Sequence, residues 1–141
     1  AIDARLLVLD EPTLGLDLLF RRQFYDTLLN DYFDKERTIL LTTHQVEEIE
    51  NLLTDVIFIN RGHIALNSSV EDLTTRYVQL SVSADKITRA RALKPFYERE
   101  LFGRIIMFFE GRPAEELAPM GDIRAPSIAD LFVAKMQGAP A

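Results

Sequence analysis

The chain has 141 residues, of which 48% are hydrophobic and 27% are charged, a composition typical of a soluble globular protein with one domain or two small ones. Its formal net charge of −6 argues against a nucleic-acid partner, because nucleic-acid-binding proteins normally present a basic surface. The absence of cysteine excludes disulfides and thiolate metal sites, and no apolar run approaches the roughly 20 residues that span a bilayer.

The first half of the sequence alternates between strand and helix patterns. Arg5–Asp10 contains an uninterrupted apolar run, which is typical of a parallel strand buried on both faces. From Leu18 to about Lys35 the spacing of apolar residues predicts an amphipathic helix. A second apolar strand is predicted at Thr38–Thr42 and a short acidic helix at Gln45–Leu53. A third strand, Asp55–Asn60, is predicted to form a hairpin with Ile64–Leu66, and a short helix capped by Ser69 follows.

A different pattern begins at residue 77. Val78–Val82 alternates with period two, as a half-exposed strand does. A helix is predicted to follow at Asp85–Leu93, and then two hairpin-connected strands at Phe96–Leu101 and Ile105–Phe109. A second helix is predicted at Pro113–Leu117 and a last strand at Asp122–Ala125. This β-α-β-β-α-β order predicts a small ferredoxin-like α+β domain. Ser127 is placed to cap a final helix that extends through Met136.

Acidic and imidazole side chains follow the ends of the first two apolar strands. A nucleotide triphosphatase must hold Mg²⁺, activate a water molecule and neutralise charge on the transferred phosphoryl group. Asp10, at the carboxyl end of a buried strand, is a hard oxygen ligand suited to Mg²⁺. Glu11 can accept a hydrogen bond from the attacking water, and His44, at the end of the next strand, can donate to a terminal phosphate.

The same residues also have a purely structural interpretation. Asp10, Glu11 and Pro12 form a good turn, and Asp17 is a good N-cap for the helix that follows. The functional interpretation is favoured by the combination of Asp10-Glu11 with His44, because each of these polar segments follows an apolar strand and one helix connects the two strands. Gly15 and Asp17 lie in the loop between them.

Residues 5–60 resemble the C-terminal half of the ATPase domain of ATP-binding cassette (ABC) transporters. Leu6–Glu11 is similar to the family's Walker B strand with its catalytic glutamate. Pro12–Asp17 is similar to the D-loop, and Thr42-Thr43-His44 to the switch-histidine loop. Further along the chain, residues 61–76 resemble the family's closing hairpin and helix, and Pro126–Phe132 resembles the end of exporter-type subunits.

The resemblance implies a fold and a set of roles. The fold is α/β, a part of a P-loop NTPase (RecA-like) parallel sheet followed by the small α+β appendage and the C-terminal helix. Asp10 would organise Mg²⁺, Glu11 would activate water and His44 would contact the γ-phosphate of ATP. Gly15 and Asp17 would belong to the interface with a second ATPase subunit. The intact protein would couple ATP hydrolysis to transport, of export type, through a membrane permease subunit at the cytoplasmic face of the cell membrane.

The sequence lacks three motifs of the family that it resembles. None of its six glycines is followed by lysine, so it contains no G-x-x-x-x-G-K-[ST] phosphate loop, and it contains neither the family's Gln loop nor its LSGGQ-type signature. These three motifs lie upstream of the Walker B strand in the family, and the chain opens at Ala1. We therefore expect a fragment that binds no nucleotide or Mg²⁺ by itself and has no ATPase activity. Without the phosphate-loop strand we also expect unpaired strand edges, and with them an oligomer or a strand-exchanged dimer.

Three parts are expected in the chain: residues 1–76 from the ATPase domain, 77–125 as a regulatory or accessory domain, and 126–141 as the C-terminal helix and tail. Two alternatives remain open. The chain could derive from an ABC-type ATPase of DNA repair or translation, although the acidic composition and compact tail favour a transporter. Alternatively, residues 77–141 could act as a non-enzymatic regulatory or dimerisation module.

Overall fold

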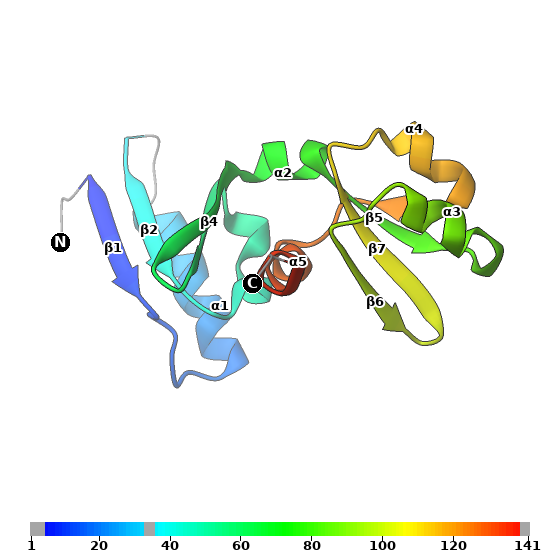
Figure 1. Ribbon diagram of the computed structural model, residues 1–141. Coiled ribbons are helices and arrows are strands. Elements are labelled where there is room, and N and C mark those ends of the chain that lie inside the picture. Colours follow the sequence, from blue (N-terminus) through cyan, green and yellow to red (C-terminus); the bar gives the residue numbers. More distant parts are fainter. Residues whose placement is uncertain (1–4, 33–35, 139–141) are drawn as a thin grey trace. The chain divides into compact units, whose positions relative to one another are not determined.

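The computed structural model describes residues 5–32 and 36–138 (Figure 1). The chain is of mixed α/β type, with three separate sheets and a C-terminal helix among the described residues. It divides into two compact units, Ala1–Gln45 and Val46–Ala141. None of the helices described is both long and apolar enough to cross a lipid bilayer.

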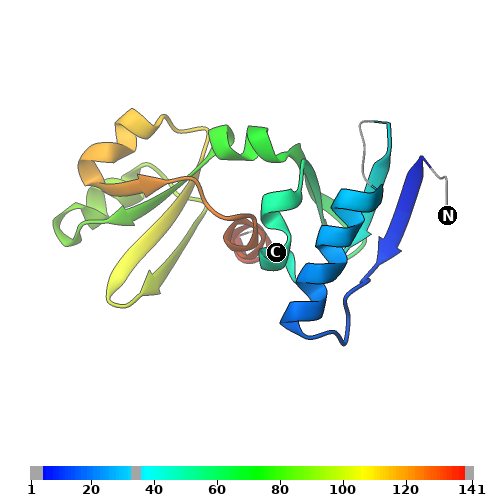
Figure 2. The ribbon, with the colours of Figure 1, turned by 180° about the vertical axis from the view of Figure 1, so that it is seen from behind.

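The first unit is a pair of parallel strands connected by a helix. Strands β1 (Leu6–Asp10) and β2 (Thr38–Thr42) pair in register, residue 6 with 38 and residue 10 with 42. Helix α1 (Leu18–Thr27) lies against one face of this pair (Figure 2) and continues into a π-helical turn, Leu28–Tyr32. The expected end of this helix at Lys35 lies outside the described residues.

The two faces of the β1–β2 pair differ in exposure. Leu7, Leu9, Ile39 and Leu41 are half-buried on the face toward the helix. On the opposite face Leu6, Val8 and Leu40 are about half exposed, at 55%, 57% and 49%. The expectation of a strand buried on both faces is therefore wrong for the structure described here, because a two-stranded sheet with one helix covers only one of its faces.

The second unit begins with two short 3₁₀ turns, Val46–Glu48 and Glu50–Leu52, where the sequence predicts one acidic helix. Ile49, between the turns, has φ −125° and ψ −1°, which interrupts helical hydrogen bonding, and its side chain is buried. An antiparallel hairpin of β3 (Asp55–Asn60) and β4 (His63–Ser69) follows. Strand β4 extends well beyond the expected Ile64–Leu66.

Helix α2 (Val70–Arg76) follows directly, and the hydroxyl of Ser69 caps it by accepting from the backbone N–H of Asp72 at 3.1 Å. This is the cap that the sequence predicts. The remaining elements of the second unit are β5 (Tyr77–Val82), a 3₁₀ turn (Ala84–Lys86), α3 (Ile87–Ala92), β6 (Tyr97–Leu101), β7 (Arg104–Glu110), α4 (Ala114–Leu117), a 3₁₀ turn (Ala118–Met120), β8 (Gly121–Arg124) and α5 (Ile128–Gly138).

Strands β5 to β8 form one antiparallel sheet in the order β6-β7-β5-β8. Their sequence order with the intervening helices, β-α-β-β-α-β, is the order predicted from the residue pattern. The β6–β7 hairpin closes through Phe102 and Gly103, both with positive φ (50° and 75°), as in the two-residue turns that match strand twist. Phe102 is 97% exposed at this tip.

One face of this sheet packs on α3, α4 and the adjoining turns. The cluster combines inward side chains of the two central strands with residues of these helices: Leu80, Val82, Ala90, Met107, Phe109, Leu117 and Met120. On the opposite face, Ile106 and Phe108 contact Ala134 of α5. Large apolar side chains are therefore buried on both faces of this sheet.

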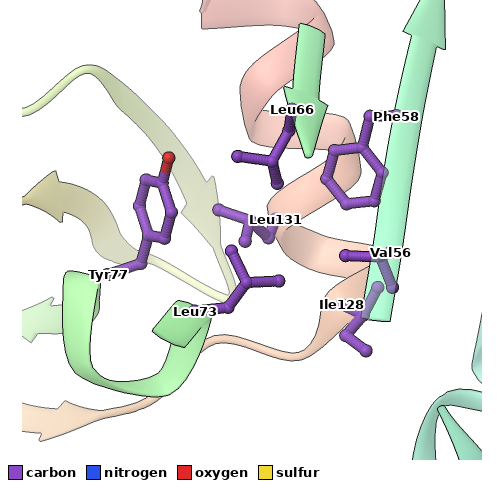
Figure 3. Close-up of a cluster of buried hydrophobic side chains, with 7 residues drawn as sticks. All are labelled: Val56, Phe58, Leu66, Leu73, Tyr77, Ile128 and Leu131. Carbon is purple, nitrogen blue, oxygen red and sulfur yellow. The ribbon is translucent and has the colours of Figure 1, made fainter. Parts of the chain in front are cut away.

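A second cluster joins segments from before and after residue 76 (Figure 3). It is formed by side chains of the β3–β4 hairpin, α2, β5 and α5: Val56, Phe58, Leu66, Leu73, Tyr77, Ile128 and Leu131. Helix α5 is also tied to the start of the unit, because Glu50 Oε2 accepts from the backbone N–H of Ile128 at 2.9 Å. Residues 46–76 thus pack with the C-terminal helix. The division of the chain into residues 1–76, 77–125 and 126–141 stays a prediction.

Candidate functional site

The first unit brings the predicted site residues to one edge of its sheet. Parallel pairing in register places the ends of β1 and β2, Asp10 and Thr42, side by side. Glu11 directly follows β1, and His44 lies two residues beyond β2. Since parallel strands end at the same edge of a sheet, Asp10, Glu11 and His44 meet at the carboxyl edge where α/β proteins bind ligands.

Two hydrogen bonds fix the acidic side chains at this edge. The hydroxyl of Thr42 donates to Asp10 Oδ1. His44 Nδ1 lies 2.8 Å from Glu11 Oε1, with the His44 side chain 67% exposed and that of Glu11 31% exposed. An ionised carboxylate only accepts, so Nδ1–H donates and the imidazole orients the Glu11 side chain. At this exposure the pair contributes only about 0–1 kcal/mol to stability.

The backbone at Glu11 adopts a left-handed conformation, with φ 44°. Its N–H donates to Thr42 O at 2.9 Å and to Thr42 Oγ1 at 3.2 Å, which holds the bend against β2. A non-glycine residue in this region costs about 1–3 kcal/mol, and such strain gathers at functional sites. The bend turns the chain out of the sheet at Glu11, immediately after Asp10.

The loop from Pro12 to Asp17 is held by helix α1. Asp17 caps the helix, accepting from the backbone N–H of Phe20 at 3.0 Å, as its structural interpretation predicts. The Thr13 side chain is buried, with Oγ1 3.4 Å from the Tyr25 hydroxyl oxygen, and Arg21 Nε donates to Leu16 O at 2.7 Å. Gly15 has φ 84°, a conformation that favours glycine, and the space around it is open.

Neither Thr42 nor Tyr25 is among the catalytic, metal-binding or interface residues that the sequence predicts, although Thr42 belongs to the motif that resembles the switch-histidine loop. Thr42 hydrogen-bonds both Asp10 and Glu11, and Tyr25 is the buried partner of Thr13 in the loop. A signal for Thr42 was present, because it is the last residue of the second predicted parallel strand, and the carboxyl ends of parallel strands lie at one edge of a sheet. The Thr13–Tyr25 contact had no such signal, since it depends on how α1 is rotated against the loop.

The donor set around Asp10 fits one carboxylate ligand of Mg²⁺ and not a complete metal site. In the part of the chain that the structure describes, no group of three or more His, Cys, Asp or Glu side chains could hold a metal ion. Mg²⁺ in nucleotide-dependent enzymes is held through one or two carboxylates together with substrate phosphates. Asp10 fits that contribution, and the phosphates and other residues would have to supply the remaining ligands.

No protein-family model matches the chain. Among curated proteins, it is 32% identical over 123 residues to Nod factor export ATP-binding protein I of Cupriavidus metallidurans, which covers 84% of this chain and 40% of that protein. It is 36% identical over 75 residues to ABC transporter A family member 8 of Dictyostelium discoideum, covering 53% of the chain and 9% of that protein.

A third relative is an energy-coupling factor transporter ATP-binding protein of Staphylococcus epidermidis, 29% identical over 57% of the chain and 28% of that protein. The chain thus spans less than half the length of each of these relatives. Its homologues are ABC transporter ATP-binding proteins, and the matches are consistent with a chain that corresponds to the C-terminal part of such an ATPase.

Proposed function

We propose that this chain supplies the hydrolytic carboxylates of an ABC transporter ATP-binding protein, which couples ATP hydrolysis to transport across a membrane. The observation that carries the proposal is the meeting of Asp10, Glu11 and His44 at one carboxyl sheet edge. The transporter ATP-binding proteins among its relatives support the same assignment. The most direct test is ATP hydrolysis by a complete protein that contains this sequence, compared with its Glu11→Gln variant.

In this proposal each residue at the edge has a separate task. Asp10, held by Thr42, would contribute a carboxylate to Mg²⁺, which would neutralise charge on the phosphates when bound. Glu11 accepts a hydrogen bond from the attacking water and positions it for in-line attack. Its side chain is already oriented by His44 at 2.8 Å.

The His44 contact limits how this residue can bind phosphate. With Nδ1–H donated to Glu11, a neutral imidazole has only a lone pair on Nε2. A hydrogen bond from Nε2 to a terminal phosphate therefore requires either the imidazolium form or release of the Glu11 contact. We propose that His44 exchanges its partner from Glu11 to the γ-phosphate when nucleotide is bound.

The loop that contains Gly15 and Asp17 is proposed to face a second ATPase subunit. Two apolar side chains beside them are exposed, Leu14 at 68% and Leu16 at 37%. Thr13, Leu16 and Asp17 are all anchored to helix α1 or to its first turn, so the loop presents these side chains in a fixed conformation. A preformed loop with exposed apolar side chains is suited to an interface.

We propose that the 141-residue polypeptide is by itself inactive. Its sequence contains no phosphate loop, whose backbone N–H groups and lysine supply most of the attraction for the triphosphate. Two carboxylates at the sheet edge would repel ATP in the absence of that cationic cradle. ATP and Mg²⁺ are thus ligands of the complete protein in this proposal.

The part after residue 76 is proposed to be a ferredoxin-like accessory domain of an export-type subunit. The antiparallel strand order β6-β7-β5-β8 with α3 and α4 on one face supports that fold. The Nod factor export relative supports the export type, because its match extends over 123 residues of this chain. A membrane permease would be the partner, which places the protein at the cytoplasmic side of the membrane.

The polypeptide alone is expected to form oligomers. The β1–β2 pair exposes Leu6, Val8 and Leu40 on one face, and the β3–β4 hairpin exposes Ile57 at 50% and Ile59 and Ile64 each at 65%. Apolar sheet faces and unpaired strand edges associate with other chains. Light scattering after size-exclusion chromatography should give a mass of at least twice 16.1 kDa. A single monomeric species across a tenfold range of concentration would contradict this proposal.

A further inference from the structure

The sheet of the second unit carries a hollow of about 270 Å³ on the face that α5 covers only in part. The hollow is lined by Gln79, Ser81, Ile106, Asp122, Ile123 and Arg124. In the antiparallel register Ser81 pairs with both Ile106 and Asp122, and Gln79 pairs with Arg124. Paired residues share a face of a sheet, so the side chains of these five residues project together, whereas Ile123 pairs with Leu80 and packs on the opposite face.

A buried glutamine holds the guanidinium group of Arg124. Gln79 lies on the central strand β5 and is 3% exposed. With its amide oxygen turned toward β8, Gln79 accepts from both Nε and Nη2 of Arg124 at 3.1 Å. A guanidinium has five N–H groups, so this contact leaves an N–H on each terminal nitrogen. That remaining edge has the geometry that binds a carboxylate through two parallel hydrogen bonds.

The charges around the hollow favour an anion. Within residues 5–32 and 36–138 no carboxylate forms an ion pair with Arg124. Arg104 Nη1 approaches Ser81 Oγ at 3.5 Å and Asp122 Oδ2 at 3.9 Å, with the two charged side chains 64% and 88% exposed. The hollow is thus lined by one guanidinium, that of Arg124, and one carboxylate, that of Asp122, and the carboxylate is already paired with Arg104. These three groups leave one net positive charge, in a chain whose overall charge is −6. This is a local positive site on an acidic protein.

We propose that this hollow binds a small organic carboxylate, with Arg124 as the residue that receives the carboxylate group. The volume of about 270 Å³ lies just below the range of about 300–1,000 Å³ that pockets for drug-sized ligands have, so the hollow suits only a molecule smaller than these. Asp122 lies at the rim and repels a second negative charge, so a monoanion is preferred to a dianion such as phosphate. Gln79 acts as a positioning residue, because it fixes the guanidinium before the ligand arrives.

The test is a titration of the ¹⁵N-labelled polypeptide with sodium acetate at constant ionic strength, followed by NMR. Saturable shifts are expected at the amides of Gln79, Ser81 and Asp122 and at Nε–H of Arg124, with half-saturation at about 1–10 mM for so small a probe. Inorganic phosphate at the same ionic strength and pH should bind at least threefold more weakly. Shifts that stay linear to 100 mM acetate, or tighter binding of phosphate, would overturn the proposal.

Three variants and a matched control separate the site from general charge effects. Arg124→Gln should weaken acetate binding at least tenfold, whereas Arg89→Gln, the same change at an exposed position of α3, should leave it unchanged. Asp122→Asn should strengthen it about threefold by removing the repelling charge. Gln79→Met should weaken it while Arg124 is still present. Equal effects of the Arg124 and Arg89 substitutions, with both variants folded by circular dichroism, would show that the hollow is not an anion site.

Discussion

In a complete ATP-binding protein that contains this sequence, Glu11→Gln is expected to lower the rate of ATP hydrolysis at least 100-fold while ATP still binds. The amide keeps the size of the side chain but loses the carboxylate that accepts a hydrogen bond from water. Steady-state phosphate release measures the rate, and equilibrium binding of labelled ATP measures the affinity. Since the interaction acts on the reacting water, kcat should fall and the dissociation constant of ATP should change less than threefold.

Glu47→Gln is the matched control for this substitution. Glu47 is an exposed acidic residue in the 3₁₀ turn that follows His44 in the sequence, so the change removes the same charge at a position to which we assign no part in hydrolysis. It should alter the hydrolysis rate less than twofold. If Glu11→Gln and Glu47→Gln slowed hydrolysis to the same extent, Glu11 would have no specific part in the reaction.

Leu131→Ala is expected to lower the free energy of unfolding by about 2–5 kcal/mol, the usual cost of a cavity left by a fully buried leucine. Leu131 is 1% exposed on α5 and packs with Val56, Phe58 and Leu66 of the β3–β4 hairpin (Figure 3). Urea unfolding followed by circular dichroism measures the change. Amide hydrogen exchange should show faster opening in β3 and β4 as well as in α5, because one cluster stabilises all three.

Val133→Ala provides the comparison on the same helix. Val133 is 39% exposed, and its truncation should cost less than about 1 kcal/mol. A loss of protection confined to α5 in Leu131→Ala would mean that the hairpin is stable without the helix. That result would separate residues 46–76 from the C-terminal helix, contrary to the packing described above.

The positions of the strands and of the site edge could be predicted because they depend on local patterns. The apolar runs before Asp10 and His44 define two parallel strands, and parallel strands align their carboxyl ends. The helix caps at Asp17, Ser69 and Ser127 were also readable, since each side chain accepts a hydrogen bond from a nearby backbone N–H in the first turn of its helix.

Features that depend on tertiary contacts could not be predicted. The acidic helix expected at 45–53 is two 3₁₀ turns, because burial of Ile49 and the link from Glu50 to α5 override helix propensity. The exposure of Leu6 and Val8 depends on how many strands and helices cover the sheet, which an apolar run alone does not encode. The contact between Gln79 and Arg124 depends on the register between β5 and β8, two strands far apart in sequence.

We propose that this polypeptide carries hydrolytic side chains without the residues that hold nucleotide. Titration calorimetry of the 141-residue chain with MgATP tests it most directly, combined with phosphate release by the same chain and by its Glu11→Gln variant. We predict no saturable heat up to millimolar MgATP and equal, background release from both proteins. Saturable binding, or phosphate release by the unmodified chain above that of the variant, would contradict the claim.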